Sequence, residues 1–152
     1  FVTGIGTGIG KTLTAAVICE NLKADYWKPV QAGNLDESDT EKVKSLISNN
    51  VSVFHTETFR LTQPLSPHAA AEIDKLEIKL EDFKIPNSDN NLVIEGAGGL
   101  LVPLSNKQRQ LPEAQNNYLR LCKPDKQLRI QPEANSRDTR FFAMLPTLGL
   151  AA

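Results

Sequence analysis

The sequence is poor in the residues on which disulfide-stapled, zinc-binding and membrane proteins depend. Its 152 residues include only two cysteines, Cys19 and Cys122, too few for a disulfide framework or, by themselves, a four-ligand zinc site. No apolar run reaches the roughly 18 residues of a membrane span. The first residues lack the basic and apolar regions of a signal peptide, and the chain starts at Phe1 rather than Met, so we expect residues upstream. These absences predict a cytoplasmic protein with reduced thiols and no membrane partner.

The charge is distributed unevenly along the chain. Residues 1–106 hold nine Lys and Arg against 14 Asp and Glu, a net charge of −5. Residues 107–152 hold eight Lys and Arg against four Asp and Glu, a net of +4. The acidic first part argues against a nucleic-acid partner. The switch predicts one folded domain over residues 1–106, followed by an atypical basic tail over residues 107–152.

Local patterns in the first part alternate between strand and helix. The predicted strands cover residues 1–3, 26–30 and 91–95, with an extended segment over 51–61. The predicted helices cover residues 11–22, 38–48, 68–73 and 76–83. This order is typical of an α/β fold with a parallel sheet and helices on both faces. Residues 107–152 contain four prolines, one Ile and no Val, so we expect a sheet that is incomplete at the C-terminal end and a poorly ordered tail.

A glycine-rich loop stands between the first predicted strand and the first predicted helix. It reads GIGTGIGKT from Gly4 to Thr12, a P-loop with one residue more than usual between its outer glycines. Backbone N–H groups of such a loop surround phosphate oxygens, and the helix N-terminus adds positive potential. Lys11 would reach the terminal phosphates and Thr12 would ligate Mg²⁺. The predicted nucleotide-binding residues of this loop are Gly4, Gly6, Thr7, Gly8, Ile9, Gly10, Lys11, Thr12 and Leu13. A glycine-rich turn with an exposed lysine is the alternative.

Polar residues also stand at the ends of two other predicted strands. Glu95 ends one strand and can hold Mg²⁺, unless it is merely a solvated strand end. The glycine-rich residues after it are predicted to approach the nucleotide: Gly96, Ala97 and Gly98. Lys28 ends the other strand, where it would neutralise charge on a transferred phosphoryl group or lie on the surface. Asp39 either reaches the metal or caps a helix, a role that Ser38 could also fill.

The third candidate is the rigid loop that contains Ser66, Pro67 and His68. No Ser/His/Asp triad can be assembled around it, so we expect a positional role at a substrate pocket rather than nucleophilic catalysis. A purely structural role for His68 is the alternative.

Five motifs follow one another in a fixed order. They are GIGTGIGKT at 4–12, KPVQAG at 28–33, SD at 38–39, PLSPH at 64–68 and EGAGG at 95–99. Together they resemble the dethiobiotin synthetases, ATP-dependent enzymes of biotin synthesis, over residues 1 to about 106. The resemblance implies a P-loop NTPase-like fold, ATP as co-substrate, Mg²⁺ and a homodimer.

The resemblance also implies roles for individual residues. Lys11 and Lys28 would be catalytic, and the metal would be held by Thr12, Asp39 and Glu95. The substrate site would include Lys28, Ala32, Ser66 and His68. The family joins CO₂ to the diamine 7,8-diaminopelargonate, activates the resulting carbamate with ATP and closes a ureido ring. Two departures concern Gly8, where many members carry an acidic residue, and Ala32, where many carry a hydroxyl.

Two other functions stay open at this point. A related ATP-dependent amide-forming synthetase would share the P-loop and Glu95 but should lack the Ser66-Pro67-His68 loop. An inactive nucleotide-binding fragment would bind ATP without turnover.

Overall fold

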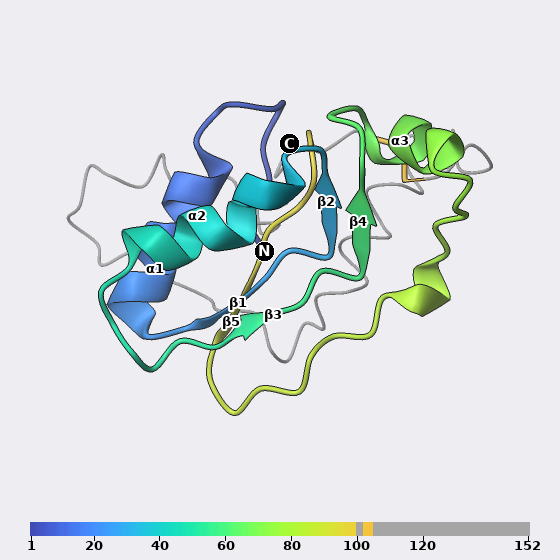
Figure 1. Cartoon of the computed structure of the whole chain (residues 1–152). Helices are drawn as coiled ribbons and strands as arrows, with labels where there is room; N and C mark the ends of the chain where they lie inside the picture. Colours follow the sequence, from blue (N-terminus) through green and yellow to red (C-terminus); the bar gives the residue numbers. More distant parts are fainter. Residues whose placement is uncertain (100–101, 105–152) are drawn as a thin grey trace, which may run out of the picture.

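The computed structural model describes residues 1–99 and 102–104. Its helices are α1 (Lys11–Leu22), α2 (Asp39–Leu46) and α3 (Pro67–Ile73), with short 3₁₀ turns η1 (Leu35–Glu37) and η2 (Leu80–Asp82). Its strands are β1 (Asp25–Trp27), β2 (Val30–Ala32), β3 (Phe54–His55), β4 (Phe59–Leu61) and β5 (Leu92–Ile94) (Figure 1). The predictions for residues 107–152 lie outside the described residues.

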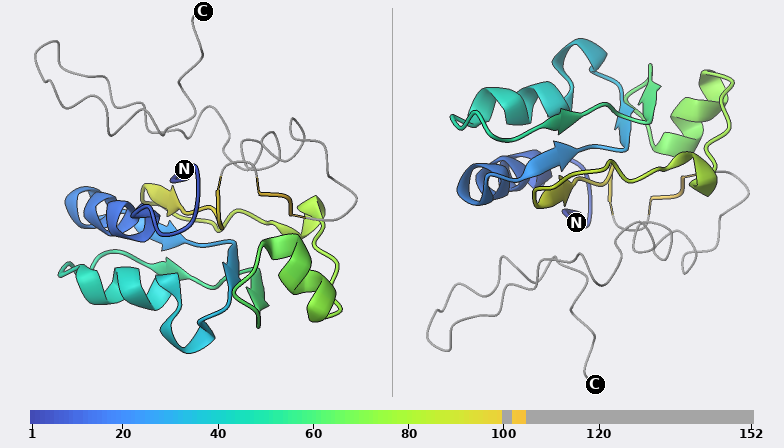
Figure 2. Two further views of the ribbon diagram at one scale, coloured as in Figure 1. Left: turned by 90° about the horizontal axis from the view of Figure 1, so that it is seen from above. Right: turned by 90° about the horizontal axis from the view of Figure 1, so that it is seen from below.

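The strands pair in parallel throughout the described part of the chain. One sheet has the order β3-β1-β5, and Val2 extends it through a parallel bridge to Glu95. The other sheet pairs β2 with β4. Helices α1 and α2 lie side by side next to the first sheet, and α3 packs against β2 and β4 (Figures 1 and 2). The predicted α/β class with a parallel sheet is confirmed.

The single strand predicted over residues 26–30 is wrong in its extent. The structure divides it into β1 and β2, which belong to different sheets. Pro29 stands at the break because it has no N–H to donate to a ladder and it restricts the backbone of Lys28. The chain therefore leaves the first sheet directly after β1 and pairs with β4 from Val30 onward, and Lys28 lies at the end of β1.

Among residues 1–99 and 102–104, two apolar clusters form the core on opposite sides of β1 and β5. Tyr26 and Val93 pack with small residues of α1, whereas Trp27 and Ile94 pack with residues of α3 and β4. Alternate strand residues point to opposite faces, which explains this division. Leu46, the last residue of α2, is exposed.

The remaining sequence expectations have mixed outcomes. The first helix begins and ends as predicted, and α3 begins one residue early, at Pro67. The segment 76–83 forms only η2 rather than a full helix. Cys19 is a free, buried thiol, and burial raises its pKa to about 12. None of the described helices has the length and apolar character needed to cross a membrane.

Candidate functional site

The carboxyl ends of three parallel segments meet at one edge of the sheet. Val2 leads into the glycine loop, β1 leads into Lys28, and β5 leads into Glu95. Backbone hydrogen bonds fix their register: Glu95 N donates to Trp27 O at 3.0 Å, and Gly96 N donates to Val2 O at 2.9 Å. Crevices at this edge are where open α/β sheets bind ligands. The fold therefore brings the three predicted motifs together.

Glu95 is fully buried at the centre of this edge. Its Oε1 accepts hydrogen bonds from Thr12 Oγ1 and Lys28 Nζ, both at 3.0 Å. Its Oε2 accepts a hydrogen bond from Tyr26 OH at 2.9 Å. A buried carboxylate requires such partners, because the charge has lost its hydration. These contacts exclude the alternative of a solvated strand-end glutamate.

Lys28 bridges two carboxylates. Its ammonium group donates to Glu95 Oε1 and to Asp39 Oδ2, and the residue is only 4% exposed. Burial opposes the ionisation of Asp39, but the ammonium groups of Lys28 and Lys42 outweigh it and lower the pKa of that carboxyl. The alternative of a surface lysine is therefore excluded, and positive charge is stabilised between Asp39 and Glu95.

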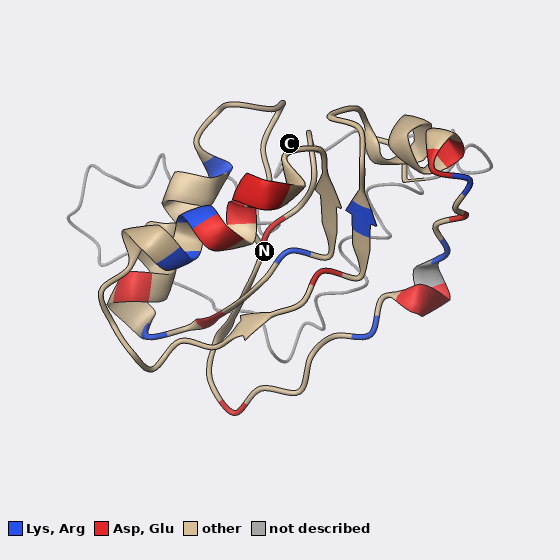
Figure 3. Ribbon diagram, viewed as in Figure 1, with Lys and Arg blue, Asp and Glu red and all other residues tan. Residues whose placement is uncertain are grey.

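The start of α2 places Asp39 beside this lysine. Ser38 is the N-cap, and its Oγ accepts a hydrogen bond from Glu41 N at 3.3 Å. Gln31 of β2 connects this strand to the start of α2. Its Oε1 accepts a hydrogen bond from Asp39 N at 3.2 Å, and its Nε2 donates one to Gly33 O at 2.8 Å. The Asp39 side chain is thus left for Lys28 rather than for capping. Figure 3 shows the acidic residues of η1 and the first turn of α2 next to this point.

The glycine loop has the open backbone that phosphate binding requires. Gly8 and Gly10 have positive φ values of 73° and 93°, a conformation that favours glycine. Among the described residues, a Cβ added at Gly6, Gly8 or Gly10 would meet no atom within 4 Å, so this part of the chain leaves space over the loop. Lys11 folds back over the loop, with Nζ donating to Gly6 O at 2.6 Å. Burial lowers the pKa of Lys11, partly offset by the charge of Glu95.

The glycine-rich segment after Glu95 packs directly against the loop. A Cβ at Gly99 would lie 2.7 Å from the carbonyl oxygen of Ile5, so only glycine permits this approach. Gly98 has a φ of 65°, and a Cβ there would lie 2.9 Å from Val102. The segment from Gly96 to Gly99 thereby holds the loop against the sheet edge.

A pocket of about 180 Å³ opens beside Lys28. Its walls come from the loop, β2, the segment before α3 and the residues after β5: Thr7, Lys28, Ala32, Pro64, Leu65, Ser66, Pro67, Ala97, Gly98 and Val102. The predicted substrate residues Lys28, Ala32 and Ser66 are therefore brought together. His68 is not part of the wall, and its Nδ1 lies 3.3 Å from the carbonyl oxygen of Pro103.

The oxygen donors near Lys28 fit Mg²⁺ in their chemistry. Mg²⁺ prefers oxygen ligands and is usually held by one or two carboxylates together with phosphate oxygens. Thr12, Asp39 and Glu95 provide a hydroxyl and two carboxylates around one point that already accommodates a cationic group. Within the described ranges no group of three or more His, Cys, Asp and Glu residues is placed to hold a metal ion, so Mg²⁺ here would also need oxygen ligands from phosphate or water.

Sequence reasoning missed two residues that organise this site, Tyr26 and Gln31. The signal for Tyr26 was available, because residues 26 and 28 have the same parity on one strand and point to the same face. Gln31 has the opposite parity and belongs to the next strand, β2, beyond the break at Pro29, so the alternation along β1 does not single it out. The contact with Asp39 could not be inferred without the fold.

Comparisons with known proteins identify the family of the chain. The chain belongs to the AAA_26 family, described as an AAA domain, whose family model matches residues 1–116. It is 56% identical over 108 residues to an ATP-dependent dethiobiotin synthetase BioD of Christiangramia forsetii, covering 71% of this chain and 52% of that protein.

Two further relatives carry the same description. The protein of Cytophaga hutchinsonii is 48% identical over 106 residues (69% of this chain, 51% of the relative), and that of Brucella ovis is 50% identical over 106 residues (70% and 50%). The chain thus spans about half the length of these curated relatives. The similarities confirm the resemblance drawn from the motifs.

Proposed function

We propose that the chain carries the nucleotide and phosphoryl-transfer site of an ATP-dependent dethiobiotin synthetase. The observation that carries the proposal is the buried Lys28 ammonium, held between Asp39 and Glu95 beside an open P-loop. Phosphoryl transfer needs positioning and charge stabilisation more than covalent chemistry from the protein. The similarity to three proteins of this description supports the same activity.

The phosphates of ATP would lie over the open backbone between Gly6 and Gly10. Lys11 would leave the Gly6 carbonyl and donate to the phosphates, since a charged acceptor makes the stronger hydrogen bond. Thr12, Asp39 and Glu95 would hold Mg²⁺, which supplies charge neutralisation on the phosphate oxygens when bound. The residues from Gly96 to Gly98 would keep the loop in place.

The diamine would occupy the pocket between Lys28 and Ser66. One amine combines with CO₂ to a carbamate, whose oxygen attacks the γ-phosphate and displaces ADP. The second amine then attacks the carbamic–phosphoric anhydride, closes the ureido ring and releases phosphate. Lys28 lies between the predicted phosphate site and the pocket, so it can stabilise the charge that develops during transfer. Ala32 would contribute only its backbone N–H, and His68 would act from behind the pocket, where it contacts the carbonyl of Pro103 next to the wall residue Val102.

Further elements of the proposal rest on the family resemblance and on the composition and charge pattern of the sequence. They are a homodimer, a cytoplasmic location, small-molecule partners without nucleic acid or membrane, and a boundary at residue 106 between the domain and the tail. Sedimentation of the purified chain tests the dimer directly.

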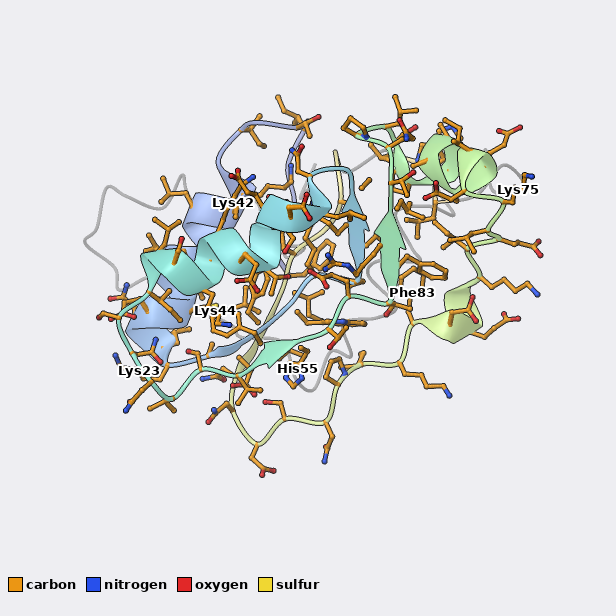
Figure 4. All side chains as sticks on the ribbon, in the orientation of Figure 1. Lys23, Lys42, Lys44, His55, Lys75 and Phe83 are labelled. Carbon is orange, nitrogen blue, oxygen red and sulfur yellow. The ribbon has the colours of Figure 1, made fainter. Side chains whose placement is uncertain are left out.

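The Lys28→Gln variant tests the proposal. Turnover should fall much more than ATP affinity, because the interaction strengthens in the transition state. Phosphate release in the presence of diamine, bicarbonate and Mg²⁺ measures turnover, and calorimetry measures ATP binding. Lys44→Gln is the matched control, since Lys44 is an exposed lysine on α2 (Figure 4). Equal turnover in the two variants would refute the role of Lys28.

The same assay separates the two alternatives. An amide-forming synthetase would release phosphate with another carboxylate substrate and ignore the diamine. A nucleotide-binding fragment would bind ATP without any diamine-dependent phosphate release.

A further inference from the structure

We propose that Tyr26 is a positioning residue for Glu95, and that its hydroxyl determines how strongly Mg²⁺ enhances nucleotide binding. This inference rests on the proposed function, because it concerns the same site. No motif singled out Tyr26, and the residue belongs to β1 rather than to any loop around the pocket.

Tyr26 is wholly buried and aimed at one oxygen of Glu95. Its exposed fraction is 0%, and its hydroxyl donates to Oε2 at 2.9 Å. The hydroxyl acts as a hydrogen-bond donor to the carboxylate.

The two oxygens of Glu95 have different partners. Oε1 accepts from Thr12 of the P-loop and from Lys28, whereas Oε2 accepts from Tyr26 on the opposite side. The terminal torsion of a glutamate is soft, so the carboxylate plane is fixed by hydrogen bonds rather than by its rotamer. With Oε2 occupied, only Oε1 is presented toward the residues expected to hold Mg²⁺.

Loss of the hydroxyl would leave Oε2 buried without this donor. The carboxylate would then turn toward its remaining donors and present a different edge to the metal. Groups that orient metal ligands in this way typically change metal affinity by 10–100-fold when they are removed. The contacts of the glycine loop do not involve Tyr26, so binding of nucleotide without metal should not change.

The test is a calorimetric titration of Tyr26→Phe with ADP, in MgCl₂ and in EDTA. We expect the ADP affinity in EDTA to stay within about twofold of wild type, while the gain produced by Mg²⁺ falls about tenfold. Trp27→Phe is the matched control. It removes a buried donor from the same strand, the Nε1 bond to Thr56 O at 3.1 Å, but on the opposite face. Its Mg²⁺-dependent gain should equal that of wild type.

A double-mutant cycle of Tyr26→Phe with Glu95→Gln in urea gives a readout that needs no nucleotide. We expect the two substitutions to be coupled about fivefold or more in the unfolding constant. Additive effects would overturn the proposal, and so would coupling with an unchanged Mg²⁺ gain, which would mean a structural role only. If wild type binds no ADP under either condition, the proposed function fails and this inference falls with it. If wild type binds ADP and the gain is unaltered in Tyr26→Phe, only the inference about Tyr26 fails.

Discussion

At the scale of single residues, the burial of the charges in this site is difficult to explain by a contribution to the free energy of folding. An ammonium and a carboxylate lose hydration when they are buried, and their attraction often does little more than offset that loss. Lys28 and Glu95 nevertheless lie almost wholly out of water and share one hydrogen bond. Their placement beside an open glycine loop is more consistent with chemistry than with structural reinforcement.

Replacement of Lys11 by Ala should remove most nucleotide affinity. Lys11 is the lysine of the glycine loop, and its ammonium group, which donates to the Gly6 carbonyl, can contact the phosphates instead. Loss of a charge-assisted contact of this kind costs on the order of 2–4 kcal/mol. Calorimetry with ATP measures the loss against Lys44→Ala as the surface control. Unchanged ATP affinity would mean that the loop does not bind phosphate.

Substitutions at Gly33 and Gly6 should separate an effect on stability from an effect on nucleotide affinity. Gly33 has a φ of 69°, and a Cβ there would lie 2.6 Å from Pro64, so Gly33→Ala should destabilise the fold by more than about 1 kcal/mol. A Cβ at Gly6 would meet no atom within 4 Å in the part of the chain that the structure describes, so Gly6→Ala should change stability by less than about 0.5 kcal/mol. The same methyl group should lower nucleotide affinity, because it projects into the space left for phosphate. Urea unfolding and calorimetry measure the two effects, and equal ADP affinity in Gly6→Ala and wild type would contradict the placement.

At the scale of elements, the stability of helix α2 depends on its N-cap residue, Ser38, and the helix begins with the site residue Asp39. Ser38 is 1% exposed and caps the helix, which leaves Asp39 directed toward Lys28. Ser38→Ala should lower the free energy of unfolding by about 1 kcal/mol. Ser45→Ala on the same helix is the control, because that side chain is exposed, and it should change stability by less than about 0.5 kcal/mol. Equal stability of the two variants in urea would refute the cap.

The elements that sequence reasoning predicted well are those with local signals. The helix over residues 11–22 follows a glycine loop and ends where Lys23 adopts a left-handed conformation, so both of its ends are set by neighbouring residues. The strand over 26–30 was wrong because its two halves pair with different partners, and pairing is not a local property. The same holds within the site: the motifs indicated Lys28, Asp39 and Glu95, but not that one ammonium bridges both carboxylates.

At the scale of the whole molecule, several carboxylates make stability depend on pH. Glu20 accepts hydrogen bonds from Asn49 and Ser48, which lower its pKa from 4.5 to about 2. The pKa values of Asp25, Asp39 and Glu57 are also lowered, because their hydrogen bonds and neighbouring charges outweigh burial. The folded state thus binds fewer protons than the unfolded state in acid.

The stability contributed by Glu20 should therefore be complete above about pH 4.5 and be lost as the pH falls toward about 2. Glu20→Gln should be less stable than wild type at pH 7, with a difference that shrinks below pH 4.5. Urea midpoints across this range measure the difference, and Glu37→Gln on the exposed turn η1 is the control. A difference that stays constant with pH would contradict the role given to Glu20.

The proposed function requires that this site join CO₂ to a diamine at the expense of ATP. The most direct measurement incubates the purified chain with ATP, Mg²⁺, 7,8-diaminopelargonate and carbon-13-labelled bicarbonate, followed by mass spectrometry of the products. The site described above predicts dethiobiotin that carries the label in its ureido carbon, in an amount equal to the phosphate released. Phosphate release that does not depend on the diamine, or bound nucleotide without labelled dethiobiotin, would contradict the claim.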